Sequence, residues 1–281
     1  MKTMIRNPFI YAILFVITLF VLSCQLYPGQ QTVLNLDAAH SWARTHIADP
    51  SAYMVKSESF ADIQIFDNPA KAGKPTFHVR KSLGVGTGSG TVIADKGYLL
   101  TAGHVIDDAN VILEVNEIVD ELRVKYPKTF IDAKVITEYT MIDHKGKDFL
   151  AAKVAIGEND LGLIRAQDPD KFTGTPVDVS RETNLSDKAV IMIGSPLRIK
   201  DIIMDGRVGR EDITKFGEGS YKYVIAPIVP GNSGGAVITL HDMKLVGVVT
   251  AVMVKDGSFT NLALFVPNDI INNFLEKNLP K

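Results

Sequence analysis

Residues 230–235 read Pro230-Gly231-Asn232-Ser233-Gly234-Gly235, a serine among three glycines. Apolar runs at residues 223–229 and 236–240 flank this segment, which predicts a turn between two strands. Glycine tolerates backbone angles that other residues avoid, so such a turn allows a close backbone approach. Two interpretations follow from these residues alone. The segment is either a Gly-rich hairpin loop, or it carries a nucleophilic serine whose neighbouring backbone N–H groups point into one pocket.

Two other segments favour the nucleophile. Thr101-Ala102-Gly103-His104-Val105-Ile106 follows a strand-like run, and Asp160 precedes the apolar residues 161–164. A serine hydroxyl needs a base to accept its proton; histidine is the usual base, and an acid orients its ring. The residues His104, Asp160 and Ser233 could supply these three parts, in that chain order.

The choice of the acid has an alternative. Asp107 and Asp108 lie too near His104 in the chain and are expected to cap a short helical turn. Asp148, which precedes the apolar residues 149–152, is a rival to Asp160. Both readings stay open on residue type alone.

The motifs together resemble the trypsin-like (chymotrypsin-fold) serine peptidases, most closely their HtrA/Deg branch. The matching segments are Gly88-Ser89-Gly90, residues 98–105, 160–164, Gly194-Ser195-Pro196, and residues 231–235, 245–251 and 265–268. The resemblance runs from about residue 77 to the C-terminus. Its Asp-Leu-x-Leu-Ile pattern favours Asp160 over Asp148.

The fold implied by this resemblance is all-β, with two six-stranded antiparallel β-barrels and a short C-terminal helix. We expect a protease domain at residues 59–281, with barrel 1 at about 59–170 and barrel 2 at about 171–267. The closing helix is expected at residues 268–279, with Asn268 as N-cap. No room remains after it for the PDZ domain that many HtrA/Deg relatives carry, so we expect the protease domain only.

Local patterns predict the elements within this domain. In the first barrel, strands are expected at residues 61–66, 77–79, 90–93, 97–101, 111–115, 133–137 and 161–164. In the second they are expected at residues 188–193, 202–208, 221–225, 236–240, 245–254 and 262–266. Residues 117–126 are expected to form a helical or irregular insertion.

The resemblance implies a serine endopeptidase, a hydrolase that works through an acyl-enzyme. His104 is expected to be the base, Asp160 the orienting acid and Ser233 the nucleophile. The oxyanion hole is expected at Gly231, Asn232 and Ser233. No metal or cofactor is expected, because the sequence has no Cys/His cluster of metal-binding spacing.

Substrate preference is predicted from two segments. The resemblance implies an S1 pocket built before the nucleophile and on a later strand, here by Pro227, Ile228, Thr250, Ala251 and Val252. No acid lies between residues 223 and 233 to pair with a basic side chain. We expect cleavage after small or medium aliphatic residues, with the backbone of residues 250–252 pairing with the substrate as an added strand.

Residues 1–24 are predicted to be a signal peptide with a lipobox. Lys2 and Arg6 give it a positive start, and residues 9–22 form an apolar run shorter than the ~20 residues of a membrane-spanning helix. The end of the run, Val21-Leu22-Ser23-Cys24, resembles a bacterial lipobox, and Cys24 is the only cysteine. Lipidation of Cys24 would tether the protein to a membrane. An uncleaved anchor or ordinary secretion is the alternative.

The remaining features concern setting and partners. Residues 25–58 are expected to be a tether with a short helix at residues 36–47. A net charge of −2 gives no indication of nucleic-acid binding, and one cysteine permits no internal disulfide, which suits the bacterial branch of the family. We expect a lipid-anchored protein of the bacterial cell envelope that acts on protein or peptide substrates in protein quality control, as a homotrimer like its relatives. The alternative is a catalytically silent barrel that serves as a membrane-tethered binding or chaperone-like protein.

Overall fold

The computed structural model describes residues 36–67, 75–199, 202–210, 212–215 and 218–280. The chain divides into two units, Met1–Ser41 and Trp42–Lys281. The predicted signal peptide, Cys24 and the first part of the tether lie outside the described residues. Among the helices that are described, none has the length and apolar character needed to cross a membrane.

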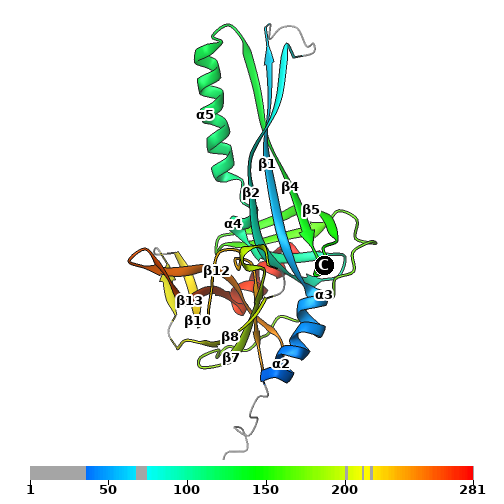
Figure 1. Cartoon of the computed structure of the whole chain (residues 1–281), viewed down its shortest axis with the longest axis vertical. Helices are drawn as coiled ribbons and strands as arrows, with labels where there is room; N and C mark the ends of the chain where they lie inside the picture. The colour runs from blue at the N-terminus through cyan, green and yellow to red at the C-terminus, as the bar shows by residue number, and fades with distance from the viewer. Residues whose placement is uncertain (1–35, 68–74, 200–201, 211, 216–217, 281) are drawn as a thin grey trace, which may run out of the picture. The chain divides into compact units, whose positions relative to one another are not determined.

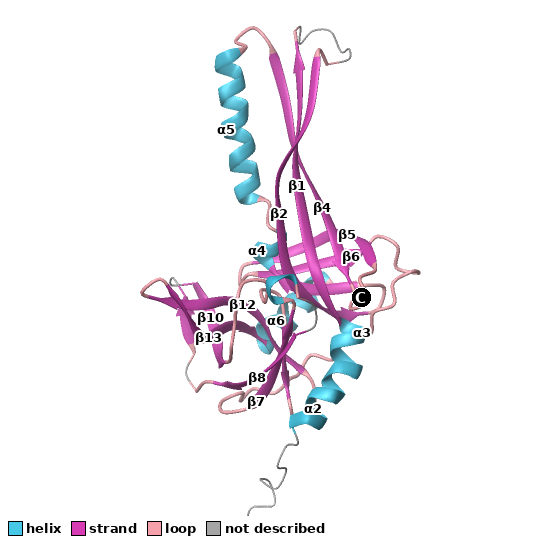
Figure 2. Ribbon diagram, viewed as in Figure 1, coloured by secondary structure: helices cyan, strands magenta, loops and turns pink. Residues whose placement is uncertain are grey.

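The first barrel is a closed antiparallel sheet in the order β1-β2-β3-β6-β5-β4 (Figures 1 and 2). Its strands are β1 (Ala52–Phe66), β2 (Phe77–Ala94), β3 (Tyr98–Ala102), β4 (Phe130–Ile142), β5 (Asp148–Gly157) and β6 (Leu161–Ala166). The turn between β2 and β3 has positive φ at Lys96 and Gly97, as a tight hairpin requires. Apolar residues from all six strands fill the interior, among them the fully buried Leu99, Met141 and Ile164.

The second barrel follows after a linker, residues 167–188. Its strands are β7 (Ala189–Gly194), β8 (Ile202–Val208), β9 (Ile213–Lys215), β10 (Glu218–Ile225), β11 (Ala236–Thr239), β12 (Leu245–Lys255) and β13 (Ser258–Pro267). The sheet order is β13-β12-β11-β7-β8-β10-β9, and a further pairing of β13 with β10 closes six of these strands, leaving β9 as an added edge. The expectation of two six-stranded antiparallel barrels is therefore confirmed.

Three strands of the first barrel continue as an extension. The outer parts of β1, β2 and β4 stay paired as a three-stranded sheet, and helix α5 (Ala109–Lys125) runs alongside it (Figure 1). The face toward α5 buries Ala61, Ile63 and Ile65 of β1 against Val115 and Val119 of the helix.

Two expectations were wrong in this region. Residues 111–115, predicted as a strand, form the first half of α5. The β-branched residues there favour a strand, but the apolar positions of the whole segment recur at helical spacing and face the extension. Strand β1 begins at Ala52 and includes residues that the sequence assigned to the tether. Its polar residues can lie in the strand because β1 pairs with β2 on one edge and with β4 on the other.

Short helices occupy the N-terminal side of the described chain. They are α2 (Leu36–Ala43), a π-helical turn η1 (Arg44–Ala48) and α3 (Asp49–Ser51). This agrees with the helix expected at residues 36–47. Trp42 stacks on His46 at a ring-centroid distance of 4.5 Å.

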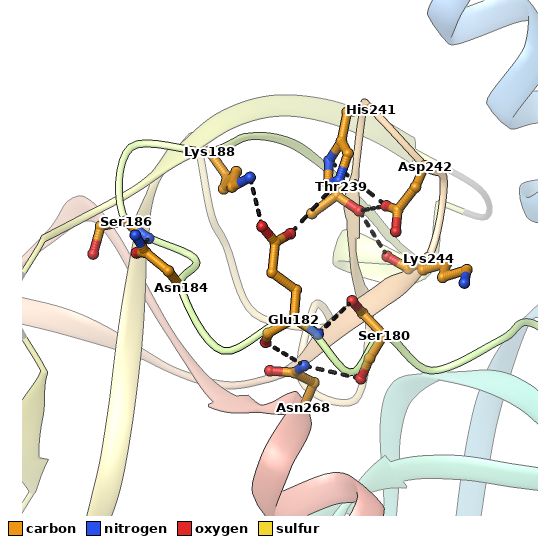
Figure 3. Close-up of polar contacts among 10 residues, drawn as sticks. All are labelled: Ser180, Glu182, Asn184, Ser186, Lys188, Thr239, His241, Asp242, Lys244 and Asn268. Atoms are coloured by element: carbon orange, nitrogen blue, oxygen red, sulfur yellow. Dashed lines mark hydrogen bonds and ion pairs between the residues drawn. The ribbon is translucent and has the colours of Figure 1, made fainter.

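The C-terminal helix α6 (Asn268–Asn278) is present as expected, but Asn268 is not its N-cap. Pro267 holds that position, and the buried Asn268 side chain donates from Nδ2 to the carbonyls of Ser180 and Glu182, both at 2.9 Å. In the same linker, Glu182 pairs with Lys188 at 2.6 Å (Figure 3). Helix α6 thus fastens the linker that connects the two barrels.

Candidate active site

His104 and Asp160 meet because β3 and β6 are neighbouring strands. His104 lies in α4 (Gly103–Ile106) directly after β3, and Asp160 directly precedes β6, where Ala102 pairs with Leu161. The backbone N–H of His104 donates to Asp160 Oδ1 at 2.7 Å, and His104 Nδ1 lies 2.8 Å from Asp160 Oδ2. Two contacts to one carboxylate fix both the main chain and the ring of the histidine.

The rival aspartate occupies a different place. Asp148 is exposed at the first position of β5, where it pairs with Ile142. Asp107 and Asp108 also stay outside the His104 contact: Asp107 accepts from the N–H of Ala109, and Asp108 binds Tyr139 and Lys153. Among these four acids, the structure brings Asp160 to His104.

The second barrel reaches the same carboxylate through Thr250. The Thr250 hydroxyl donates to Asp160 Oδ2. The pairing of β12 with β13 shifts register between Val249 and Ala251, so this buried threonine lies at a strand irregularity. The sequence placed Thr250 on the substrate side only. A single hydroxyl within the apolar run of residues 245–252 was the signal that could have suggested a polar partner.

The Asp160 carboxyl is tuned by opposing effects. Burial by itself would raise its pKa, but the hydrogen bond and charge of His104, the hydroxyl of Thr250 and the His104 backbone N–H together hold the pKa below its ordinary value. Asp160 is therefore a carboxylate at neutral pH. A negative charge at this position stabilises a protonated His104 ring.

In the loop around Ser233, the four consecutive backbone carbonyls of residues 230–233 accept hydrogen bonds. The bonds are Leu197 N–H to Pro230 O at 3.0 Å, Ser89 Oγ to Gly231 O at 2.7 Å, Gly235 N–H to Asn232 O at 2.8 Å and Ser89 N–H to Ser233 O at 2.7 Å. Within the described residues, the N–H groups of Gly231 and Ser233 make no backbone hydrogen bond. These two donors are available to an anion or a polarised carbonyl beside Ser233.

Glycine is required at two positions of this loop. Gly231 and Gly234 have φ of 102° and 86°. A Cβ at Gly231 would lie 2.7 Å from Ser195 O, and one at Gly234 would lie 2.0 Å from Ser89 O. Side chains are excluded by both conformation and space.

Asn232 differs from the expectation that it contributes to the oxyanion hole. Its backbone N–H donates to Val229 O at 3.3 Å, and its side chain is buried. Its Oδ1 atom has no hydrogen-bond partner among the described residues. Asn232 therefore presents no backbone donor beside Ser233.

The residues predicted to bind substrate come from two neighbouring segments. Ile228 is buried in the second-barrel core with Val249, and Val252 packs against the same cluster. Pro227 is exposed, and Ala251 is half-buried on β12. Ile228 and Val252 thus both contribute to the second-barrel core or its edge, while Pro227 is exposed.

A recess of about 370 Å³ adjoins His104. Its walls come from residues 83–87 of β2, from Asp107 and Asp108, and from the start of α5. The recess is large enough for a few side chains of a peptide bound beside His104.

Comparisons with known proteins agree with this architecture. A family model described as "Trypsin-like peptidase domain" matches residues 88–248, which include His104, Asp160 and Ser233. The periplasmic serine endoprotease DegP of Escherichia coli (strain K12) is 30% identical over 190 residues, covering 66% of this chain and 34% of DegP. The periplasmic pH-dependent serine endoprotease DegQ of the same strain is 28% identical over 197 residues, covering 68% of this chain and 37% of DegQ. The chain thus spans about a third of the length of these relatives.

Solved structures give the same fold. The HtrA-type protease AlgW with decapeptide superposes with a TM-score of 0.57 at 17% sequence identity, over 85% of this chain and 66% of AlgW. The matched segment exceeds half of the chain and includes strands of both barrels. The chain belongs to the trypsin-like peptidase family.

Proposed function

We propose that the protein is a serine endopeptidase in which His104, Asp160 and Ser233 form the catalytic triad. The observation that carries the proposal is the loop at Ser233. Its carbonyls are engaged, while the N–H groups of Gly231 and Ser233 make no backbone hydrogen bond within the described residues. The contact of His104 with Asp160 and the names of the relatives, which are serine endoproteases, support the same activity.

The mechanism follows from these groups. His104 accepts the proton of Ser233 Oγ as that oxygen attacks the peptide carbonyl, and the resulting oxyanion accepts hydrogen bonds from the N–H groups of Gly231 and Ser233. Each such donor is worth a factor of about 10²–10³ in rate. The His104 imidazolium, stabilised by Asp160, then gives its proton to the leaving amine. Finally, His104 accepts a proton from a water molecule as the water attacks the acyl carbon, and His104 returns this proton to Ser233 Oγ as the acyl–Oγ bond breaks.

For specificity, we propose cleavage after small or medium aliphatic residues. Ile228 belongs to the second-barrel core, Val252 packs against that core, and no acid lies between residues 223 and 233. Thr250, Ala251 and Val252 would pair with the substrate through their backbone. Peptide-library profiling is expected to return Val, Ala or Leu at P1. Arg or Lys at that position would contradict the assignment.

For the setting, we propose the bacterial cell envelope, because the relatives are named as periplasmic. The predicted lipobox at Cys24 adds a lipid anchor, and the HtrA resemblance adds a homotrimer and a part in protein quality control. Cys24→Ser is expected to move the protein from the membrane fraction to the soluble fraction. The direct measurement is the mass of the N-terminal peptide, which is expected to include the lipid in the wild type and to lack it in Cys24→Ser.

Activity-based labelling tests the triad. Full-length protein in detergent is treated with a fluorophosphonate, and the modified residue is located by peptide mass mapping. Labelling is expected at Ser233 and is expected to be lost in His104→Ala and in Ser233→Ala. An unlabelled wild-type protein whose Ser233→Ala variant still prevents aggregation of unfolded proteins would instead establish a catalytically silent, chaperone-like barrel.

A further inference from the structure

Ser89 lies at the contact between the two barrels. It belongs to β2 of the first barrel, within Gly88-Ser89-Gly90, and only 1% of its surface is exposed. Its neighbours across the contact are the loop that carries Ser233 and the turn that begins at Ser195. A buried hydroxyl at such a place needs hydrogen-bond partners.

Three contacts of Ser89 reach the second barrel. Its hydroxyl donates to Gly231 O at 2.7 Å and accepts from the N–H of Ser195 at 2.7 Å. Its backbone N–H donates to Ser233 O at 2.7 Å. A fourth contact secures Ser89 within its own barrel, where Thr101 Oγ1 donates to Ser89 O at 2.7 Å. Ser89 therefore donates hydrogen bonds to the carbonyls on both sides of Asn232, those of Gly231 and Ser233.

The hydroxyl also acts on the next peptide plane indirectly. The turn that it holds at Ser195 continues to Leu197, whose N–H donates to Pro230 O at 3.0 Å. The Pro230 carbonyl and the Gly231 N–H belong to one planar peptide, so fixing the carbonyl fixes the direction of that N–H. Gly231 has φ of 102° and no side chain to restrict rotation, so its two flanking peptides depend on such external contacts.

We propose that Ser89 is a positioning residue of the oxyanion hole, through which the first barrel fixes the donors that surround Ser233. The inference rests on the proposed triad and assigns to Ser89 a part that the catalytic residues do not supply. Replacing its hydroxyl would leave the Gly231 carbonyl and the Ser195 N–H without these partners, while the backbone contact to Ser233 would remain. The expected defect is therefore in the orientation of the Gly231 N–H group.

The same strand offers a matched control. Thr91 is also 1% exposed, and its hydroxyl has no hydrogen-bond partner among the described residues. Thr91→Val removes a buried hydroxyl of β2 without removing a contact to the nucleophile loop. Ser89→Cys keeps a γ-atom at this position, a thiol that is somewhat larger than the hydroxyl and a weaker donor, and it carries the test if Ser89→Ala does not give a cooperative thermal melt.

The experiment uses full-length protein and a peptidyl trifluoromethyl ketone, which forms a charged tetrahedral adduct with an active serine. Its affinity is compared with that of the cleaved product peptide, which forms no adduct. Ser89→Ala is expected to lower kcat and the trifluoromethyl ketone affinity by about 10- to 100-fold, a part of the effect of losing one oxyanion donor. The KM and the product affinity are expected to be unchanged, Ser89→Cys to be intermediate and Thr91→Val to behave as wild type.

Other outcomes separate the two proposals. A wild-type protein that neither reacts with the fluorophosphonate nor binds the ketone would overturn the triad, and this inference with it. A wild-type protein that reacts, together with a folded Ser89→Ala variant of equal ketone affinity, would overturn the role of Ser89 alone. Equal losses of ketone and product affinity in Ser89→Ala or Ser89→Cys would also overturn it, since they would indicate general damage to the site.

Discussion

At the scale of single residues, hydrogen-bond partners decide the properties of the acids in the first barrel. Asp160 and Asp108 are both aspartates near His104, but they have different partners. Asp160 binds the His104 ring, and Asp108 binds Lys153 at 2.6 Å and Tyr139 at 2.9 Å. Both carboxyls have a pKa below the ordinary value although burial acts in the opposite direction. Asp160 therefore belongs to the proposed triad, and Asp108 to a contact with Lys153 and Tyr139 that favours its ionised form.

Asp160→Asn is expected to lower kcat by about 10⁴-fold, because an amide cannot stabilise the His104 imidazolium or select the correct ring tautomer. Asp148→Asn is the matched control and is expected to retain wild-type kcat, since Asp148 is exposed at the start of β5. Peptide hydrolysis at neutral pH measures both. A large loss in Asp148→Asn with normal activity in Asp160→Asn would reverse the assignment of the acid.

Asp108→Asn is expected to lower the free energy of unfolding at neutral pH by about 1–3 kcal/mol, the usual cost of removing a charged hydrogen-bond partner. Burial by itself raises the pKa of Asp108, but the contacts with Lys153 and Tyr139 lower it by more than burial raises it. The carboxylate form is therefore favoured in the folded protein. The stabilisation is therefore present above the ordinary aspartate range, near about pH 4, and is lost as the pH falls through the folded-state pKa. Denaturant melts of wild type and variant should differ at pH 7 and converge in acid.

At the scale of elements, helix α5 depends on one face. Val115 and Val119 are buried against β1 and β4, whereas Val124 of the same helix is 84% exposed. The cluster under α5 is separate from the core of the first barrel, which includes Leu99 and Met141. Local loss of the helix should therefore leave the barrel folded.

Val119→Asp is expected to detach α5 from the extension, because a buried, unpaired carboxylate is strongly unfavourable. Hydrogen exchange of the α5 amides is expected to accelerate, while fluorophosphonate labelling of Ser233 is retained. Val124→Asp introduces the same side chain on the exposed face and is expected to exchange like wild type. Equal exchange in the two variants would show that this apolar face does not hold the helix.

At the scale of the whole molecule, the two barrels are joined by contacts between residues far apart in the chain. Ser89 and Gly231 are 142 positions apart, and Thr250 and Asp160 are 90 positions apart. Helix α6 adds the contact of Asn268 with the linker carbonyls. The site around Ser233 therefore exists only where both barrels are folded and docked.

Asn268→Ala is expected to destabilise the protein by about 1–3 kcal/mol, since the partly buried carbonyl of Glu182 would lose its amide partner. Ser180 retains a second contact, from Asn272 Nδ2 at 3.0 Å. The control is Asn273→Ala, an exposed position on the same helix, which is expected to leave the melting curve unchanged. Thermal melts by circular dichroism compare the two variants. Equal curves would show that the contact of Asn268 with the linker carbonyls does not stabilise the protein.

Sequence by itself determined the residue types of the site and their order along the chain, because the segments around His104, Asp160 and Ser233 are local motifs. The hairpin at residues 95–97 and several strands were predictable because they are short-range patterns. The two-barrel fold was predicted through the resemblance of these motifs to the trypsin-like peptidases. The helix at residues 111–115 was missed because the β-branched residues there favour a strand. The helical spacing of the apolar residues is decisive only because that face packs against β1.

Only the tertiary structure decided which hydroxyls serve the site. The hydrogen bonds from Thr250 to Asp160 and from Ser89 to Gly231 both join one barrel to the other. No local pattern encodes such partners, because they are set by how two separate cores pack against each other. The availability of the Gly231 and Ser233 N–H groups follows from the same packing, since each depends on where the neighbouring carbonyls find donors.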